Sequence, residues 1–277
     1  MVPGQLILCA TPIGNLGDAP PRLANALAEA EVIFAEDTRR SGVLLKHLGV
    51  KGRVRSYHAG NESSQSKVLE GLLAAGGIVA LMTDAGTPAI SDPGVSAVAA
   101  ARRSGSVVTL VPGPSAVTAA VALSGLPSER FVFEGFLPRK GRSRRDRLDD
   151  LVSDPRTVVF FIAPHHLLED MNDLHKTLGD RKVCVARELT KSFEEVWWGS
   201  LSEAITEWTE REPQGEFTLV VGGGAQPPVD LASAVADAGA AMEQGTPMAQ
   251  AVKEVAAATG VGRRRLYEAV LKRREGA

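Results

Sequence analysis

The chain has 277 residues, of which 44% are hydrophobic and 23% are charged, and it contains 28 Gly and 16 Pro. This ordinary globular composition excludes collagen-like, coiled-coil and intrinsically disordered chains, and the length predicts two domains with a small appendage. The longest apolar run, at residues 157–163, is far shorter than the roughly 18 residues that cross a bilayer, so no membrane partner is expected.

The net charge of −2 conceals two strongly basic segments. Residues 139–147 and 263–274 each hold six basic residues and one acidic residue, so together they carry +10 and leave −12 on the rest of the chain. Clustered Arg and Lys gain affinity for phosphates by releasing counterions. One such run alone is more often a solvated surface, but two runs on an otherwise acidic chain favour a nucleic-acid partner.

The cysteines indicate a reducing compartment. Cys9 and Cys184 both lie inside apolar, strand-like runs, and the sequence has no CxxC motif and no metal-ligand spacing. The N-terminal residues lack the basic flank and the apolar core of a signal peptide. We therefore expect a cytoplasmic protein without a disulfide framework or a metal site.

Residues 5–124 alternate between short β-rich runs and helical segments. The predicted strands are residues 5–10, 31–36, 53–57, 78–82 and 107–111. The predicted helices lie near residues 21–30, 39–48, 63–75, 95–104 and 115–124. Such alternation implies right-handed crossovers and therefore predicts a five-stranded parallel sheet with helices on both faces.

A turn-rich stretch at residues 123–130 precedes a second α/β pattern. Its predicted strands are residues 131–136, 157–163, 182–188, 196–200 and 216–223, with helices near residues 143–152, 165–178 and 201–209. Two strand patterns follow each other without a helix at residues 182–200, which predicts an antiparallel hairpin and a mixed sheet. The predicted domains are residues 1–122, 123–224 and 225–277.

The third predicted domain is helical and basic. One helix is expected to begin at Thr246, a good N-cap followed by Pro247, and to run to Gly260. A short Gly-containing break then leads into the basic segment 263–274. The pattern is similar to a helix-turn-helix, although a helical cap or a dimerisation element fits it equally well.

The loops that follow the first five strands are candidates for the functional site, because open α/β sheets bind ligands at the carboxyl ends of their strands. The fourth loop, residues 83–94, is rich in Gly and Pro, which rigidify the backbone and allow it to approach a small polar ligand. In the fifth loop, Ser115 marks a helix start that attracts a carboxylate or a phosphate. The dinucleotide-binding GxGxxG, the P-loop, HExxH and GxSxG motifs are all absent.

Side chains suited to acid–base chemistry gather in the second and third loops. His58 is the only histidine in a loop at this edge of the predicted sheet. Glu36, Asp37 and Arg39 lie in the loop after the neighbouring strand. A lone histidine is more often structural than catalytic, but this grouping makes His58 a candidate general base.

At these loops the sequence resembles the tetrapyrrole methylase superfamily, and most closely its members that act on small-subunit rRNA. The resemblance spans about residues 5–222, and its most specific part is TDAGTPAISDPG (83–94) followed by PGPSA (112–116). The other segments that carry it are ATPIGNLGD (10–18), FAEDTRRSGVLL (34–45), HAGNE (58–62) and FEGFLPRKG (133–141). The basic tail is similar to a small C-terminal domain of the same relatives.

The resemblance implies two α/β domains around a cleft for S-adenosylmethionine, with S-adenosylhomocysteine as product and no metal. It implies methylation of the ribose 2'-hydroxyl of a cytidine in the decoding region of 16S rRNA within the small ribosomal subunit. It also implies a homodimer, for which residues 196–200 are an apolar candidate surface, although adjacent tryptophans are more often core residues.

The site residues follow from the resemblance and from the loop positions. The positions expected to contact the cofactor are Pro12, Gly14, Asp84, Ala85, Gly86, Thr87, Ser115, Ala116, Ala163 and Leu219. A ribose hydroxyl is a weak acid, so a base is needed, and the catalytic candidates are His58, Glu36, Asp37 and Arg39. The residues expected to bind RNA are Arg139, Lys140, Arg142, Arg144, Arg145, Arg263, Arg264 and Arg265.

Two other functions are consistent with parts of the sequence. An enzyme of the same fold that methylates a tetrapyrrole or another small molecule would explain the loops but not the two basic segments. A nonenzymatic nucleic-acid-binding regulator would use the basic tail but leave the specialised loops without a role. Fold alone does not distinguish the acceptors, because one scaffold hosts several.

Overall fold

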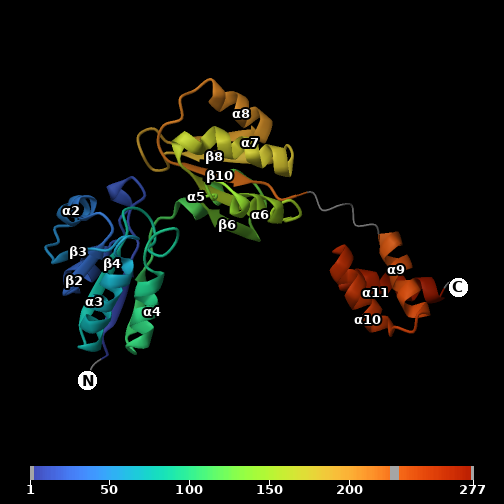
Figure 1. Ribbon diagram of the computed structural model, residues 1–277, viewed down its shortest axis with the longest axis horizontal. Helices are drawn as coiled ribbons and strands as arrows, with labels where there is room; N and C mark the ends of the chain where they lie inside the picture. The colour runs from blue at the N-terminus through green and yellow to red at the C-terminus, as the bar shows by residue number, and fades with distance from the viewer. Residues whose placement is uncertain (1–2, 225–230, 276–277) are drawn as a thin grey trace. The chain divides into compact units, whose positions relative to one another are not determined.

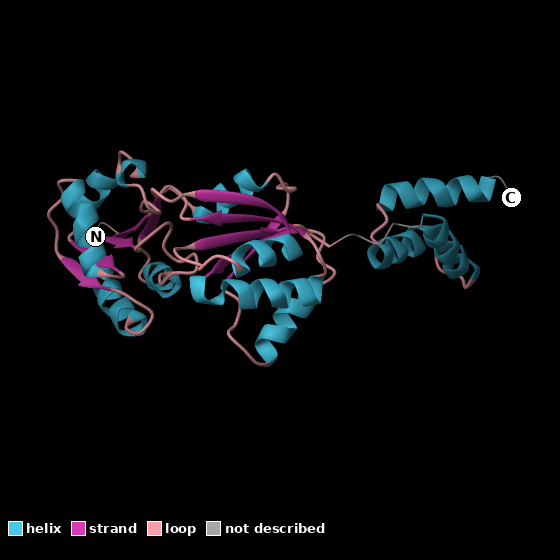
Figure 2. Cartoon of the chain, turned by 90° about the horizontal axis from the view of Figure 1, so that it is seen from above, coloured by secondary structure: helices cyan, strands magenta, loops and turns pink. Residues whose placement is uncertain are grey.

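The computed structural model describes residues 3–224 and 231–275. The chain divides into two compact units, Met1–Gly223 and Gly224–Ala277. The first unit contains two five-stranded sheets, and the second contains helices. Figure 2 shows the two sheets as separate groups of magenta strands. The two-sheet α/β architecture predicted for residues 1–224 is therefore confirmed.

The first sheet is entirely parallel, as the alternation of strands and helices predicts. Its strands are β1 (Gln5–Cys9), β2 (Val32–Ala35), β3 (Val54–Ser56), β4 (Ile78–Met82) and β5 (Val107–Val111), in the order β3-β2-β4-β1-β5. The intervening helices are α1 (Leu23–Glu29), α2 (Thr38–His47), α3 (Glu62–Ala74) and α4 (Val95–Arg103), with a 3-10 turn at Leu16–Asp18. All five strands end at the same edge, which brings the five candidate loops together.

Helices cover both faces of this sheet because strand side chains alternate between its faces. On β1, Ile7 and Cys9 pack with residues of α1 and α2. Leu6 points to the opposite face and packs with residues of α3 and α4. The near-continuous apolar strands are thus explained by burial on both sides.

The second sheet is mixed. Its strands are β6 (Phe131–Gly135), β7 (Thr157–Ile162), β8 (Lys182–Arg187), β9 (Glu195–Ser200) and β10 (Phe217–Val221), in the order β6-β7-β10-β8-β9. Only β6 and β7 pair in parallel, whereas β8 and β9 form the predicted antiparallel hairpin. Strand alternation separates the adjacent tryptophans: Trp197 packs edge-on against Trp208, while Trp198 is 57% exposed.

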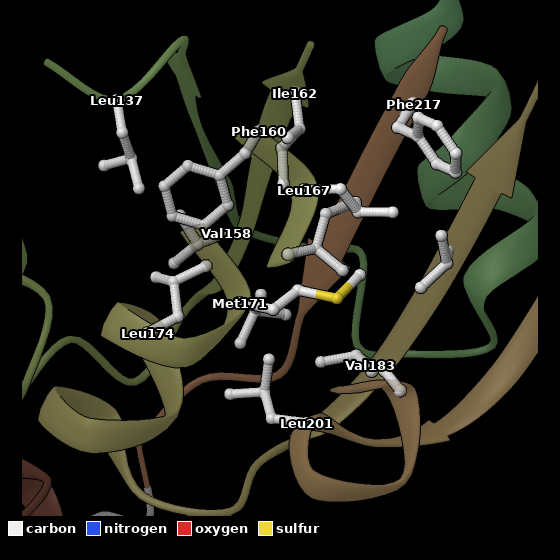
Figure 3. Packing of buried hydrophobic residues seen from close by; sticks show 14 of the residues in the cluster. Leu137, Val158, Phe160, Ile162, Leu167, Met171, Leu174, Val183, Leu201 and Phe217 are labelled. Carbon is white, nitrogen blue, oxygen red and sulfur yellow. The ribbon is translucent and has the colours of Figure 1, made fainter. Parts of the chain in front are cut away.

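One face of the second sheet is covered by α6 (Arg142–Asp150), α7 (Leu167–Leu178) and α8 (Leu201–Thr209), with a 3-10 turn at Pro164–His166. Figure 3 shows the core on this face, in which Met171 and Leu174 of α7 approach Val158 and Phe160 of β7. This core holds α7, and with it the loop after β7, in a fixed position.

The opposite face of the second sheet is covered by α5 (Ala116–Ser124), although the sequence places this helix in the first domain (Figure 1). Val117, Ala120 and Val121 of α5 share one buried cluster with Val159 and Val220. The helix is apolar on most of its surface, so it is suited to a position between two layers. Because α5 follows β5 directly, it connects the two sheets.

The second unit consists of α9 (Leu231–Glu243), α10 (Met248–Thr259) and α11 (Arg263–Glu275) around a small apolar core. The sequence did not identify α9 as a separate helix. The predicted N-cap is wrong by one residue, since Pro247 occupies the capping position and its carbonyl accepts the amides of Gln250 and Ala251. No helix in the described part of the chain has the length and hydropathy to span a membrane.

Candidate functional site

The first and fourth loops are joined at the carboxyl edge of the parallel sheet. Thr11 and Gly86 exchange backbone hydrogen bonds of 2.8 and 3.2 Å, and the Thr11 hydroxyl donates to the Thr83 carbonyl at 3.2 Å. Gly86 has φ +81°, a left-handed conformation that glycine adopts without strain. This pairing fixes residues 85–87 beside the end of β1.

The fourth loop contains backbone strain just before Asp92. Ala89 and Ser91 have φ values of 70° and 62°, which are uncommon for residues with a side chain. Gly135 of β6 sits directly against Ser91, since a Cβ there would lie 3.0 Å from its hydroxyl oxygen. Strain of this kind persists where surrounding structure imposes it, and it often marks functional sites.

Glu62 fixes the far end of the same loop. Its carboxylate accepts the backbone amides of Gly94 and Ser96, at the N-terminus of α4, at 3.1 and 3.3 Å. The Tyr57 hydroxyl, which is buried, also donates to Glu62 at 3.4 Å. These bonds lower the pKa of Glu62 although burial opposes them. Glu62 therefore supports the C-terminal end of the fourth loop.

A cavity of about 330 Å³ lies between the two sheets, a size within the usual range for small-molecule sites. It is bounded by the fourth loop, the start of α5 and the ends of β7 and β10. The lining residues are Ile13, Ala85, Gly86, Thr87, Ile90, Ser91, Asp92, Ser115, Ala116, Val117, Phe136, Phe161, Ile162, Ala163, Pro164, Ala186, Leu189, Glu216, Phe217 and Thr218.

Six of the ten residues expected to contact a cofactor line this cavity: Ala85, Gly86, Thr87, Ser115, Ala116 and Ala163. Ser115 occupies the N-cap position of α5, but its side chain makes no capping hydrogen bond. Its hydroxyl and the first amides of α5 are thus available to a ligand, as the fifth loop predicts.

Two of the other expected positions are replaced by their neighbours in the chain. Leu219 is fully buried inside the core of the second sheet, so Phe217 and Thr218, at the mouth of β10, line the cavity instead. Pro12 is buried, and Ile13 reaches the cavity in its place.

Gly14 contacts the loop after β8 rather than the cavity. A Cβ at Gly14 would lie 2.4 Å from the Lys191 side chain and 2.9 Å from the Thr190 hydroxyl, and the Asn15 amide donates to Thr190 at 3.1 Å. The first loop therefore binds the second α/β layer. A glycine at residue 14 allows the two layers to approach.

Asp84 also lies outside the cavity lining. It accepts the Asp37 amide at 3.0 Å and pairs with Arg40 at 3.4 Å. Burial raises the pKa of Asp84 despite these contacts. Asp84 thereby joins the second loop to the fourth.

None of the four catalytic candidates lines the cavity. Asp37 caps α2 through the Arg39 amide and pairs with the Arg39 guanidinium at 2.9 Å, which lowers the pKa of Asp37 to about 2. The exposed His58 accepts the Gly60 amide through Nδ1 at 3.2 Å. Glu36 accepts a hydrogen bond of 2.8 Å from the Thr83 hydroxyl.

The carboxyl that the sequence analysis did not single out is Asp92. It lines the cavity and lies close enough to the Thr83 hydroxyl, and to the charges of Glu36 and Asp84, to be affected by all three. Burial, reinforced by these charges, raises the pKa of Asp92 to about 6. A carboxyl with this pKa is well suited to accept a proton near neutral pH. Its position within TDAGTPAISDPG was visible in the sequence, but its burial was not.

The basic residues of the first cluster are not equivalent. Arg139, Lys140, Arg142 and Arg145 are exposed on the β6–α6 loop and on α6. Arg144 is only 7% exposed, and its guanidinium pairs with two aspartates of α7, so it is not part of the exposed RNA-binding surface that the sequence predicts.

The basic residues of the second cluster are all exposed. Arg263, Arg264 and Arg265 form the first turn of α11. Arg263 and Arg264 border an open hollow with Tyr267, which is 42% exposed. Within residues 3–224 and 231–275, no group of three His, Cys, Asp or Glu side chains is arranged to hold a metal ion.

Comparisons with known proteins agree with this geometry. A family model described as Tetrapyrrole (Corrin/Porphyrin) Methylases matches residues 5–205. The chain is 47% identical over 278 residues to ribosomal RNA small subunit methyltransferase I of Mycobacterium tuberculosis, covering 99% of this chain and 97% of that protein. It is 38% identical over 273 residues to the protein of that name from Escherichia coli O157:H7, covering 97% and 95%.

Two further similarities each cover 79% of this chain. A protein of the same name from Thermotoga maritima is 46% identical over 220 residues, which cover 99% of that protein but 79% of this chain. The crystal structure of uroporphyrin-III-C-methyltransferase from Thermus thermophilus superposes with a TM-score of 0.55 at 22% identity, covering 79% of this chain and 94% of that one. At that identity the superposition supports the fold alone.

Proposed function

Because this chain belongs to the tetrapyrrole (corrin/porphyrin) methylase family, we propose that it uses S-adenosylmethionine to methylate the ribose 2'-hydroxyl of a cytidine in the decoding region of 16S rRNA. The observation that carries the proposal is near-full-length identity of 38–47% to proteins named ribosomal RNA small subunit methyltransferase I. The two exposed basic clusters support an RNA acceptor over a small molecule.

The cavity lining fits S-adenosylmethionine. Phe161, Leu189 and Ile13 provide an apolar wall suited to an adenine ring, while Ser115 and the amides at the start of α5 are suited to a carboxylate. Asp92 and Glu216 add negative charge, which favours a cationic sulfonium over its neutral product. When bound, S-adenosylmethionine supplies an activated methyl group.

The chain's own task is to align the acceptor oxygen and to take its proton. We propose that Asp92, which lines the cavity, is the general base that accepts this proton, in place of His58, Glu36 or Asp37. The proton moves from the ribose hydroxyl to Asp92, and the carboxylate becomes a neutral acid. Thr83 can then accept a hydrogen bond from protonated Asp92 while donating its own to Glu36. Glu36 thus acts as a positioning residue.

RNA binding is assigned to the exposed cations of both units. Arg139, Lys140, Arg142 and Arg145 lie on the first unit, and Arg263–Arg265 on the second. The Thermotoga maritima relative is matched over 99% of its length by a span about as long as the first unit. We therefore propose that the second unit adds affinity and that the helix-turn-helix-like pair α10–α11 is not needed for catalysis.

The setting of the enzyme is also part of the proposal. The acceptor is 16S rRNA within the small ribosomal subunit, which places the protein in the cytoplasm. The family resemblance and the exposed Trp198 on edge strand β9 support a homodimer. Sedimentation of the purified protein tests the oligomeric state.

Transfer of labelled methyl tests the function. The acceptors are small ribosomal subunits that lack their own methylation, protein-free 16S rRNA and a uroporphyrinogen-type tetrapyrrole. Label in subunits or rRNA that maps to a cytidine ribose supports the proposal. Label that enters only the tetrapyrrole would refute the RNA acceptor and favour the small-molecule alternative.

Filling the cavity is expected to abolish cofactor binding without unfolding the protein. Ala85→Trp should weaken S-adenosylmethionine binding about 30-fold or more, because the indole takes the volume that the ligand needs and at least ~2 kcal/mol is lost. Isothermal titration calorimetry measures the affinity. Ala99→Trp, on the exposed face of α4, is the matched control and should bind as the native protein does. Equal affinities in both variants would place the cofactor elsewhere.

A further inference from the structure

A second cavity of about 210 Å³ adjoins the cofactor cavity and has a different chemistry. The two share Phe136 and Ala163 as walls. The remaining lining residues of this side cavity are Leu137, Arg139, Arg144, His165, His166 and Asp170. Four of them carry basic side chains, whereas the neighbouring cofactor cavity is lined by the carboxyls Asp92 and Glu216.

The floor of the side cavity is a rigid, charge-balanced network. Arg144 donates to Asp170 and Asp173 of α7, both at 2.7 Å, and to the Pro138 carbonyl at 3.0 Å. These bonds satisfy the buried guanidinium and cover Asp170, which is only 6% exposed. They also hold the β6–α6 loop, which carries Phe136 and Arg139, against α7.

The rim of the side cavity carries one guanidinium and two imidazoles. Arg139 is exposed and makes no ion pair with any residue that the structure describes. The His165 ring lies 4.3 Å from the His166 ring, centroid to centroid, and His166 Nδ1 is 3.0 Å from Glu169. A guanidinium beside two imidazoles is suited to an oxyanion, because Arg binds phosphate oxygens with paired N–H groups.

We propose that the side cavity binds a phosphodiester group of the RNA strand next to the nucleotide whose ribose enters the cofactor cavity. Phe136, 58% exposed at the boundary of the two cavities, provides an aromatic surface beside that phosphate. The inference rests on the proposed RNA acceptor and adds a specific contact that places the strand. An anion here could instead be the carboxylate of the cofactor, and the experiment separates the two sources.

Arg139→Ala tests the subsite, with Arg102→Ala as the matched control. Arg102 is also exposed, lies on α4 outside both basic clusters and lines neither cavity. The Kd for 16S rRNA, measured with S-adenosylhomocysteine present, should rise about five- to tenfold in Arg139→Ala at moderate salt. The slope of log K against log salt should flatten by about 0.7, as expected when one phosphate contact to a single strand is lost. Arg139→Lys should recover part of the affinity.

A second measurement does not depend on RNA. Inorganic phosphate added to the native protein should shift the imidazole resonances of His165 and His166, and Arg139→Ala should weaken that response. Equal RNA affinity in the two alanine variants would overturn the proposal. Imidazole resonances that do not shift when phosphate is added would overturn it as well. Loss of S-adenosylhomocysteine affinity in Arg139→Ala with RNA affinity retained would also overturn it, since the anion would then be the cofactor carboxylate. Phosphate binding without any RNA methylation by the native enzyme would refute the proposed function and support the anion site.

Discussion

Replacing Asp92 by Asn is expected to lower the rate of methyl transfer about 10³-fold while S-adenosylhomocysteine still binds. The change keeps the shape of the side chain and removes its ability to take a proton, and a positioned base typically contributes 10²–10⁴-fold. Single-turnover methyl transfer to the RNA acceptor measures the rate, and calorimetry measures the affinity. Turnover within tenfold of the native enzyme would remove Asp92 from the mechanism.

The role of Asp92 as a base also predicts how the methyl-transfer activity depends on pH. Burial raises the pKa of Asp92 from 3.8 to about 6, so the carboxylate that must accept the proton is depleted as the pH falls below 6. Native activity should therefore rise with pH, reach half of its plateau near pH 6, and stay constant above it. The residual activity of Asp92→Asn should lack this dependence.

The free energy of unfolding should fall as the pH rises, whereas the activity should increase. Because the pKa of Asp92 is higher in the folded state than in the unfolded chain, its ionisation destabilises the fold as the pH rises from 3.8 through about 6. At pH 7 the Asn variant, which has no charge to bury, should be more stable than the native protein by about 1 kcal/mol. The full shift would correspond to about 3 kcal/mol, but solvent in the open cleft screens the charge.

Glu216→Gln is the matched control for Asp92→Asn. Glu216 is the other carboxyl that lines the cavity, but its side chain is 69% exposed and pairs with Lys191. Its loss should change turnover less than about fivefold, because an exposed pair contributes at most ~1 kcal/mol. A larger effect at Glu216 than at Asp92 would exchange their roles.

The strands and the cofactor loops could be predicted because their signals are local. Apolar runs and turn residues fix each strand to within one or two residues, and the parallel order brings the loops to one edge. Ala85–Thr87 and Ser115 reach the cavity as expected. The role of Asp92 could not be predicted, since its burial arises from tertiary packing: β6, for example, packs against the neighbouring Ser91 from a distant part of the sequence.

Other features depend on contacts between the two sheets and could not be predicted either. The helix α5 follows the first sheet in sequence, but its apolar surface fits the second. Gly14 resembles a ligand-binding glycine, yet it lies against Lys191. Phe217 is the first residue of β10 and lines the cavity. Leu219 lies two residues further along the strand and is buried in the core.

Arg144→Ala is expected to destabilise the first unit by about 3–5 kcal/mol at pH 7. The sequence places this residue among surface cations, but the substitution would leave Asp170 buried without its partner and the Pro138 carbonyl without a donor. Removing one member of a buried pair typically costs this much. Burial already raises the pKa of Asp170. The variant should therefore regain part of its stability as the pH falls, because protonation of Asp170 removes the uncompensated charge.

Urea unfolding of Arg144→Ala and Arg145→Ala separates a buried role from a surface one. Arg145 is exposed, so its removal should change the free energy of unfolding by less than about 0.5 kcal/mol. The double variant Arg144→Met with Asp170→Leu should recover most of the loss, since apolar residues of similar volume can replace a buried pair. Equal stability of the two alanine variants would return Arg144 to the RNA-binding surface.

The burial of Arg144 also lowers the expected salt dependence of RNA binding by the first unit. In the first basic cluster, only Arg139, Lys140 and Arg145 make no ion pair within residues 3–224 and 231–275. Arg142 and Arg147 pair with carboxylates at 3.3 and 2.9 Å, and a cation that is already paired releases fewer counterions from RNA. A protein truncated after the first unit should thus show a slope of about −2 on single-stranded RNA, as three phosphate contacts predict. A slope near −4 would mean that all six basic residues contact phosphate, and Arg144 would then have to leave its buried site when RNA binds.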